Sequence, residues 1–527
     1  MTPTERHADR QPPSDPADVR STPLGRATLG DQLRRQARRQ PDKTAMITYT
    51  GTGDRVEISY RELHRRVTAT VDLLTGLGVR HGDVVATLLP ASVDLAVTYF
   101  AALSIGAPFT PVNPRLTDEE LDRQLRHATP RVLVVDDADR PRIATLTDDA
   151  APPVVLDRTR LPEPTGADSH VDHPVHENDV AAIIYTSGTE NAPKGVMLSH
   201  RNFLIGTTPA WVYANYLVEN DVFLLLAPGY TMAGLGTVTN VLSVGATVVI
   251  AADADPASVL AVVARDRVTV TSQTPTFYRR LAAAATPGHD LRSLRQIHVY
   301  GGAIPAAAVD RFAALAPQVE WGTYWGQSEL SQLGSVGYFR TLADIPDGNL
   351  RWIGRPMPHL EVRVLDESGA DAEVGELVCR SPATMLGYHR DRDRTAAVLG
   401  DGWLRTGDIV RTDRAGNLFF EDRRKDMIKT GGMNVSAGEV EAVIARHPAV
   451  ETVAVLGLPD EEWSEIVVAV LVTRPGQHTD EADIRAFCRR HLVGYKVPKR
   501  VEFATDLPYD AQGKLRKREL RSRIEAS

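Results

Sequence analysis

Short apolar runs alternate with helix-like segments through the first half of this chain. Residues 84–88 form an apolar run, residues 94–105 follow with a pattern typical of a buried helix, and residues 108–113 are again strand-like. Strands that alternate with helices usually form a parallel sheet with helices on both faces. The pattern therefore predicts an α/β fold. The other runs expected to be strands are residues 180–184, 222–227, 247–251, 268–272 and 296–300.

The loop that follows residues 180–184 carries groups that suit a phosphate. It offers hydroxyls, glycine backbone and a cation, which a buried phosphate needs because its charge is costly to leave unpaired. The glycine and lysine spacing differs from that of the Walker loop. The same residue types also make ordinary surface turns, so the loop alone leaves both interpretations open. The candidate phosphate-binding residues are Thr186, Ser187, Gly188, Thr189 and Lys194.

Two later loops are expected to meet the phosphate loop. One contains Tyr230 and Thr231, and the other follows Tyr300 with Gly301 and Gly302. Ligands of open α/β sheets bind past the carboxyl ends of the strands, and a glycine pair lets the backbone come close to a ligand. We expect the three loops to converge on one crevice, although a single glycine pair more commonly just turns the chain.

Residues 325–329 combine three chemistries that suit a nucleotide. The indole of Trp325 can stack on a purine, the hydroxyl of Ser328 can bond to a phosphoryl oxygen, and the carboxylate of Glu329 can hold Mg²⁺ against phosphates. Asp408, expected at a strand end, can accept hydrogen bonds from both ribose hydroxyls. Taken singly, these residues also suit core aromatics, a surface acid and a turn.

The second half of the chain predicts a change of architecture. Residues 353–388 are typical of small β-hairpins, which predicts a β-rich subdomain. Residues 421–441 form a charged connector with a glycine pair, which suits a domain boundary. Beyond it, helical and strand-like segments predict a small α+β unit of about 100 residues. We expect a disordered tail at 1–24, a large N-terminal domain of layered α/β sheets at 25–424 and a small α+β domain at 425–527.

The composition is that of an ordinary globular protein, with 43% hydrophobic residues, 24% charged residues and a net charge of −8. A nucleic-acid partner is not expected, because the basic residues 34–39 are more simply one solvated helix face. Cys379 and Cys488 lie far apart in the sequence and do not suggest a metal site or a disulfide framework. No run approaches the roughly 18 apolar residues of a membrane span, and the polar N-terminus is unlike a signal peptide. We expect a soluble, cytoplasmic protein.

In their order along the chain, these motifs resemble those of the adenylate-forming superfamily of acyl-CoA synthetases, luciferases and nonribosomal adenylation domains. Residues 185–195 are similar to its phosphate loop Tyr-Thr-Ser-Gly-Thr-Thr-Gly-x-Pro-Lys-Gly, and residues 325–329 to its Tyr-Gly-x-Thr-Glu. Residues 403–408 match its ribose-binding Trp-Leu-Arg-Thr-Gly-Asp. Residues 507–518 resemble its Pro-x-x-x-x-Gly-Lys-x-x-Arg loop, with Lys517 in place of the last arginine. The resemblance spans nearly the whole chain.

The resemblance implies two half-reactions, between which a mobile C-terminal domain turns. A carboxylic acid first attacks the α-phosphate of ATP, which gives an acyl-AMP and pyrophosphate. A phosphopantetheine thiol, on CoA or on an acyl carrier protein, then displaces AMP. By matching position, the resemblance assigns catalysis to Lys514, Thr186 and Glu329, and Mg²⁺ binding to Glu329. It assigns the hinge to Lys425. The implied cofactor-binding residues are Thr186, Ser187, Gly188, Thr189, Lys194, Gly302, Trp325, Ser328, Asp408, Arg423 and Lys429, and the implied substrate-pocket residues are Tyr230, Thr231, Tyr300 and Gly301.

Some positions depart from the family pattern. Glu190 and Asn191 stand where Thr-Gly is usual, and Thr231 stands where many members have a histidine that gates the acyl tunnel. Tyr300 and His359 also differ near the expected pocket. We expect a fatty or other apolar acid, with CoA and a carrier protein both open as acceptors. The alternatives are a diazotase-like enzyme that adenylates nitrite and a nucleotide-binding pseudoenzyme without activity.

Overall fold

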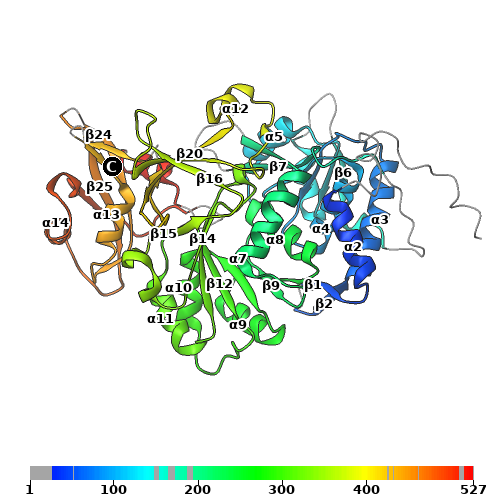
Figure 1. Cartoon of the computed structure of the whole chain (residues 1–527), viewed down its shortest axis with the longest axis horizontal. Coiled ribbons are helices and arrows are strands. Elements are labelled where there is room, and N and C mark those ends of the chain that lie inside the picture. Colours follow the sequence, from blue (N-terminus) through cyan, green and yellow to red (C-terminus); the bar gives the residue numbers. More distant parts are fainter. Residues whose placement is uncertain are drawn as a thin grey trace, which may run out of the picture.

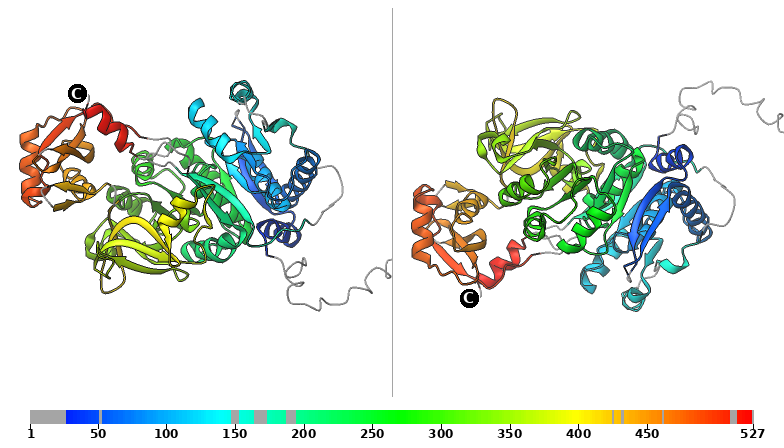
Figure 2. Two further views of the ribbon diagram at one scale, coloured as in Figure 1. Left: turned by 90° about the horizontal axis from the view of Figure 1, so that it is seen from above. Right: turned by 90° about the horizontal axis from the view of Figure 1, so that it is seen from below.

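The computed structural model describes residues 27–50, 53–146, 153–163, 173–186, 194–423, 426–430, 433–460, 462–509 and 515–525. The tail expected at residues 1–24 lies outside these ranges. Two large sheets with their helices form the main body, and the C-terminal domain lies beside it (Figure 1). Figure 2 shows the first helices (blue) and the C-terminal domain (orange to red) at opposite ends of the molecule.

The first sheet is built from strands that the alternating pattern predicts. Its described strands are β3 (Val85–Leu88), β4 (Phe109–Pro111), β5 (Val132–Val135), β6 (Val154–Asp157), β7 (Val180–Thr186), β8 (Lys194–Ser199) and β18 (Gly387–Tyr388). They lie in the order β18-β8-β7-β4-β3-β5-β6, and the neighbours from β7 to β6 are parallel. β8 and β18 extend the sheet by antiparallel pairing, so a late segment of the chain returns to its edge.

The second sheet joins an α/β half to the expected β-rich subdomain. Its described strands are β1 (Thr44–Tyr49), β2 (Arg55–Ser59), β9 (Val222–Leu225), β10 (Thr247–Ile250), β11 (Val270–Gln273), β12 (Gln296–Tyr300), β13 (Glu320–Trp325), β14 (Ser335–Phe339), β15 (Trp352–Pro356), β16 (Glu361–Leu365), β17 (Val374–Arg380), β19 (Leu399–Gly400), β20 (Trp403–Thr412) and β21 (Leu418–Arg423). The order is β16-β17-β20-β21-β15-β14-β13-β12-β11-β9-β10-β1-β2, with β19 paired to β20. Strands from β1 to β13 in this order are parallel, and those from β14 onward are antiparallel.

Two nearly wholly buried helices pack between the sheets, where the main core lies. α4 (Val93–Ile105) is capped by Ser92 and α8 (Met232–Val244) by Thr231, and almost every residue of both is buried. Both helices end at a glycine in the left-handed conformation, Gly106 and Gly245, as helices commonly do. The other described α-helices of the main body are α2 (Leu29–Arg39), α3 (Tyr60–Gly76), α5 (Asp118–Ala128), α6 (Arg140–Ala144), α7 (Thr208–Asn215), α9 (Pro256–Arg265), α10 (Pro275–Ala284), α11 (Ala306–Leu315) and α12 (Arg392–Val398).

The C-terminal domain is a sheet with helices on both faces. Its described strands are β22 (Ile428–Thr430), β23 (Met433–Val435), β24 (Val450–Asp460), β25 (Ser464–Thr473) and β26 (Arg500–Phe503). α13 (Ala437–Ile444) and α14 (Glu481–Arg489) share one core, and α15 (Lys517–Glu525) packs against the other through Leu520 and Ile524. Leu520 and Ile524 lie one helical turn apart, so α15 presents both side chains to this core.

Both cysteines are buried and unpaired. Cys379 lies in β17 and Cys488 in α14, each with 0% exposure. Burial raises the pKa of the Cys379 thiol to about 12, with a further contribution from the nearby carboxylate of Asp408. Among the described helices, none has the length and apolar character needed to cross a bilayer.

Candidate nucleotide site

The phosphate loop is held by an antiparallel hairpin at the edge of the first sheet. Thr186 ends β7 and pairs with Lys194, which begins β8, so the two residues frame the loop. Ser187, Gly188 and Thr189 lie outside the described residues, and their phosphate contacts stay predictions. The hairpin fixes the ends of the loop opposite each other, as a phosphate cradle requires.

Lys194, Glu329 and Tyr388 form one polar cluster. The ammonium of Lys194 lies 2.8 Å from Oε1 of Glu329, and the hydroxyl of Tyr388 donates to the same oxygen at 2.9 Å. The ammonium also lies 4.5 Å from the centre of the Tyr388 ring. Burial acts to raise the pKa of Glu329, but the charge and hydrogen bond of Lys194 oppose it and leave this pKa below its usual value. Glu329 is therefore an ionised carboxylate in a buried place.

The cluster brings together three segments that are far apart in the sequence. Lys194 comes from the first sheet, Glu329 from the loop between β13 and β14 of the second, and Tyr388 from β18. One carboxylate is what a protein commonly offers to Mg²⁺ that is bound mainly through nucleotide phosphates. The chemistry of Glu329 fits that role. No group of three or more potential metal ligands occurs among the described residues.

Asp408 lies within β20, which corrects the expectation that it ends a strand. Gly407 has a φ of 71°, yet β20 continues to Thr412, and its pairing with β17 shifts register across this stretch, between Arg405 and Ile409. Asp408 is fully buried. Its carboxylate accepts a hydrogen bond from the Trp325 indole at 2.8 Å and pairs with the Arg423 guanidinium at 2.6 Å. The predicted ribose-binding residue is thus joined to two other predicted nucleotide-binding residues.

Trp325 is 7% exposed and lies in the core between the sheets. Its ring packs over Gly334, where an added Cβ would lie 2.3 Å from the indole. Stacking of a purine on Trp325 stays a prediction. Ser328 begins the short 3₁₀ helix η5 (Ser328–Leu330), which carries Glu329.

The predicted substrate-pocket residues come from two loops. Thr231 accepts a hydrogen bond from the Gly234 N–H and donates to the Pro228 carbonyl, so it caps α8. Threonine is a good N-cap. Thr231, which stands where many family members have a histidine, therefore has a structural role here. Tyr230 is buried beside it.

Tyr300 ends β12 and donates to Oε1 of Gln273 at 3.4 Å. Gly301 has a φ of 73°, a conformation that favours glycine. A Cβ on Gly302 would lie 3.1 Å from Pro275, so the glycine pair does allow close packing after β12.

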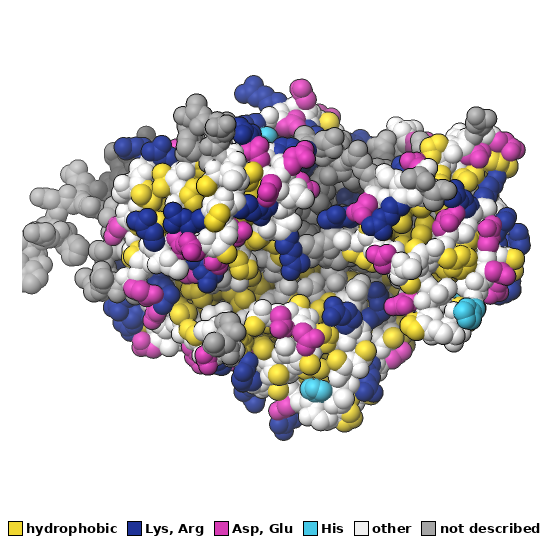
Figure 3. Space-filling model, turned by 180° about the vertical axis from the view of Figure 1, so that it is seen from behind, with side chains coloured by type: hydrophobic (Ala, Val, Ile, Leu, Met, Phe, Trp, Pro, Cys, Tyr) yellow, Lys and Arg dark blue, Asp and Glu magenta, His cyan; other side chains and the backbone are white. Residues whose placement is uncertain are grey.

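The three loops that we expected to converge on one crevice leave two different sheets. The phosphate loop follows β7 in the first sheet, whereas the other two follow β9 and β12 in the second. The loop after β9 does contact the first layer, because an added Cβ on Gly229 would lie 3.1 Å from Ala91, which follows β3. Figure 3 shows that the face behind Figure 1 is hollowed at its centre, with hydrophobic side chains visible in the hollow.

Several predicted residues lie where the structure describes no side chain. Lys514 and Lys425 lie outside the described residues, and so do Gly431 and Gly432. Lys429 has a described backbone in β22, opposite Asn434. Their roles stay predictions.

Sequence reasoning missed an aromatic cluster directly beside the phosphate loop. The Tyr185 hydroxyl lies 2.7 Å from Nδ1 of His127, whose ring meets that of His389 edge to face. The His389 N–H donates to the carbonyl of Gly195, and Arg390 donates to the carbonyl of His127. Burial, followed by the charge of Arg390, lowers the pKa of His389 to about 4. The family resemblance also covers Gly387 and Tyr388, which directly precede His389, and this was the available signal.

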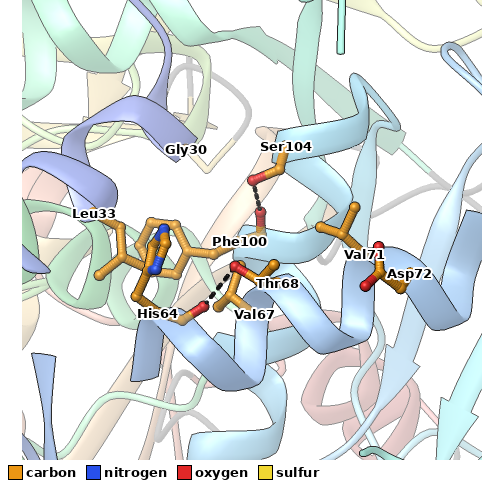
Figure 4. Close-up of a pocket in the computed structure, with 9 residues that line it drawn as sticks. All are labelled: Gly30, Leu33, His64, Val67, Thr68, Val71, Asp72, Phe100 and Ser104. Carbon is orange, nitrogen blue, oxygen red and sulfur yellow. Dashed lines mark hydrogen bonds between the residues drawn. The ribbon is translucent and has the colours of Figure 1, made fainter. Parts of the chain in front are cut away.

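The crevice drawn in Figure 4 lies away from this site, between α2, α3 and α4. Its hydroxyls are already used within the helices. Thr68 donates to the carbonyl of His64 at 3.0 Å, and Ser104 donates to that of Phe100 at 2.8 Å.

The chain belongs to the family of AMP-binding enzymes, whose model matches residues 33–389, and the model of the AMP-binding enzyme C-terminal domain matches residues 439–514. Within that family it is an AMP-forming acid–thiol ligase of the acyl-CoA synthetase type, as its motifs predicted. It is 36% identical over 507 residues to the feruloyl-CoA synthase of an Amycolatopsis species, with 94% of this chain and 99% of that protein covered.

Two further comparisons concern the acceptor and the fold. The fatty acid–[acyl-carrier-protein] ligase ScoC of Streptomyces coeruleorubidus is 33% identical, with 89% of this chain and 92% of ScoC covered. The crystal structure of ATP-bound MatB from Rhodopseudomonas palustris superposes with a TM-score of 0.85 at 28% identity, and 95% of this chain and 99% of that one are covered. The α/β fold with a small C-terminal domain is thereby confirmed. Neither the diazotase nor the pseudoenzyme alternative gains support.

Proposed function

We propose that this protein activates a carboxylic acid with Mg·ATP and transfers the acyl group to the thiol of CoA. The observation that carries this proposal is the Lys194–Glu329 pair, 2.8 Å long, at the mouth of the phosphate loop. A cation beside an ionised carboxylate suits both components of Mg·ATP. The cation attracts the phosphate oxygens, and the carboxylate attracts the metal ion.

In the first half-reaction the described residues bind and orient the nucleotide. Lys194 neutralises phosphate charge. Asp408, which is held in place by Trp325 and Arg423, accepts hydrogen bonds from the ribose hydroxyls. Glu329 would hold Mg²⁺, and the bound metal would supply positive charge against the phosphates. The family resemblance assigns to Lys514 the neutralisation of charge on the acid and the α-phosphate.

In the second half-reaction the C-terminal domain, residues 425–527, turns about Lys425 relative to residues 25–424. The turn brings Lys429 and the glycines 431–432 to the site, where the pantetheine arm enters. Separate orientations let one site serve phosphoryl chemistry and then acyl transfer. The greater identity to a CoA ligase than to the carrier-protein ligase ScoC supports CoA as the acceptor. We place the reaction in the cytoplasm, where ATP and CoA are supplied.

The test is pyrophosphate release from Mg·ATP across aliphatic, aryl and amino acids, with nitrite plus an aryl amine included. We expect release with one class of carboxylic acid. Product masses with CoA and with a phosphopantetheinylated carrier protein then identify the acceptor. Nitrite-dependent release, or ATP binding without release for any acid, would contradict the proposal.

A further inference from the structure

A tyrosine packs against the strand pair that frames the phosphate loop. Tyr185 pairs with Gly195 across β7 and β8, directly next to the pair of Thr186 with Lys194. The Tyr185 ring lies over Gly195, where an added Cβ would be 3.2 Å from Cζ of the tyrosine. Side-chain contacts across directly paired residues stabilise neighbouring strands. The placement of Tyr185 therefore bears on where Thr186 and Lys194 lie.

The Tyr185 hydroxyl is held by a histidine near the end of α5. It lies 2.7 Å from Nδ1 of His127, and α5 ends one residue later, at Ala128. Burial raises the pKa of Tyr185, so its hydroxyl keeps the proton. Burial, followed by the charge of Arg390, lowers the pKa of His127, so its imidazole is neutral. The pair therefore bonds as two neutral groups, with the tyrosine hydroxyl able to donate to Nδ1.

An arginine that follows β18 holds the C-terminus of α5. Arg390 donates to the His127 carbonyl at 3.2 Å and to the Thr129 hydroxyl at 2.9 Å. Thr129 and Arg390 both have a left-handed backbone, with φ of 44° and 53°, although neither is glycine. Such conformations cost free energy and persist where the surroundings enforce them, often at functional sites. A cation at the C-terminus of a helix also suits the helix dipole.

The same segment returns to the strand pair. The His389 N–H donates to the Gly195 carbonyl at 2.7 Å, and the His389 ring meets the ring of His127 edge to face at 5.4 Å. The contacts therefore form a closed circuit around the base of the phosphate loop. We call this circuit the hairpin clamp, and it consists of Tyr185, His127, Arg390, His389 and Gly195.

The packing of α5 does not depend on the hairpin clamp. Leu121 and Leu125 of this helix are buried in an apolar core against the first sheet. The bond between His127 and Tyr185 is therefore an added polar contact at the end of the helix, directed at the strand pair. Its loss should leave α5 packed and loosen only the base of the phosphate loop.

Holding both ends of the loop in advance should act on the affinity for ATP. A loop that becomes ordered only on binding loses conformational entropy at that moment, and this loss weakens binding. We propose that His127 is a positioning residue, which acts through Tyr185 to hold Thr186 and Lys194 where the phosphates of ATP bind. The inference rests on the proposed function.

The experiment measures the affinity of the full-length protein for Mg·ATP by calorimetric titration, without an acid. We expect His127→Leu and Tyr185→Phe each to weaken binding about fivefold, roughly the effect of one hydrogen bond. The double variant should bind about as weakly as either single variant, because the two groups act through one bond. His127→Asn should restore most of the affinity, because the amide oxygen of asparagine can accept in the place of Nδ1.

The matched control is Tyr338→Phe. The Tyr338 hydroxyl donates to the Ala214 carbonyl at 2.8 Å, and Tyr338 lies in β14 of the second sheet. This control should keep the wild-type affinity, and melting temperatures check that each variant folds. If His127→Leu melts early, the comparison of Tyr185→Phe with Tyr338→Phe still tests the proposal.

Three results would overturn the inference: single variants with wild-type affinity, additive losses in the double variant, or no rescue by His127→Asn. A wild type that does not bind Mg·ATP would instead contradict the proposed function.

Discussion

Lys194 and Glu329 lie 2.8 Å apart although one begins a strand of the first sheet and the other lies in a loop of the second. The pair therefore forms only when the two layers are docked. Replacing either residue with a neutral one leaves the other charge unpaired. The free-energy cost is larger than that of losing one ordinary hydrogen bond.

We expect Glu329→Gln to reduce the rate of pyrophosphate release by roughly a hundredfold, the usual effect of losing one preorganised charge at a transition state. The variant should also need more Mg²⁺ for half-maximal rate. Stopped-time assays over a magnesium series measure both effects. The control is Asp266→Asn, which removes another buried carboxylate, paired with Arg55 at 2.6 Å away from the site. Wild-type release by Glu329→Gln would refute the assignment.

Trp325→Phe should weaken ATP binding although an aromatic ring is kept. The variant removes the indole N–H that bonds to the buried Asp408, and losing such a bond costs about 1–3 kcal/mol. Calorimetric titration measures the affinity for ATP, and the melting temperature measures the loss of stability. Trp352→Phe is the matched control. The indole of Trp352 donates to the neutral amide of Asn417 at 3.3 Å and not to a predicted ribose-binding carboxylate. Equal ATP affinity in wild type and Trp325→Phe would show that the bond to Asp408 is dispensable.

Thr231→Ala should destabilise the protein by about 1 kcal/mol through loss of the α8 N-cap. Thr231→Ser keeps the hydroxyl and should restore most of the stability. The midpoint of urea unfolding measures both variants. If the alanine variant unfolds at the wild-type midpoint, Thr231 does not stabilise α8, and only a role in the acid pocket is left for it.

Stability should fall as the pH is lowered from about 6.5 to about 4. The pKa of His389 is about 4 in the folded protein, against an ordinary value of 6.5. Between these values the unfolded chain binds a proton that the folded protein does not, so acid favours unfolding. His389→Asn should flatten the curve of melting temperature against pH. His478→Asn, at an exposed position, should leave it unchanged, and an unaltered slope in His389→Asn would count against this origin.

Lys514→Ala should lower the rate of acyl-AMP formation by roughly a hundredfold or more, because charge on the α-phosphate would lose its neutralising group. Lys517→Ala is the matched control. Its ammonium lies 3.5 Å from Glu441 within the C-terminal domain, so its loss should leave the rate nearly unchanged. Mass-spectrometric detection of the acyl-AMP measures this step apart from thioester formation. Comparable rates in wild type and Lys514→Ala would defeat the assignment.

The sequence predicted strands well where an apolar run met a turn residue. β12 spans Gln296–Tyr300 as expected, because Gly301 directly follows the run. Asp408 was misplaced because Gly407 is a typical turn residue, whereas β20 continues through an irregularity in its pairing with β17. Bulges depend on the partner strand, which local sequence does not specify.

The site was predicted as separate motifs and not as a connected arrangement. The motif order singled out Lys194, Glu329 and Asp408 as candidates, but it did not predict that Tyr388 bonds to Glu329 or that Trp325 bonds to Asp408. Those contacts depend on how two sheets dock. Sheet membership is set by pairing between distant segments, and a periodic pattern shows only that a segment is a strand.

The burial of both cysteines makes this chain suited to distance measurements. The Cys379 and Cys488 thiols have pKa values near 12 and 11 and no exposed surface, so they are poor nucleophiles toward maleimide dyes. Cysteines introduced one in each domain can then carry a fluorophore pair without removal of the native ones. Energy transfer between the two dyes would then report the proposed rotation of the C-terminal domain in single molecules, turnover by turnover.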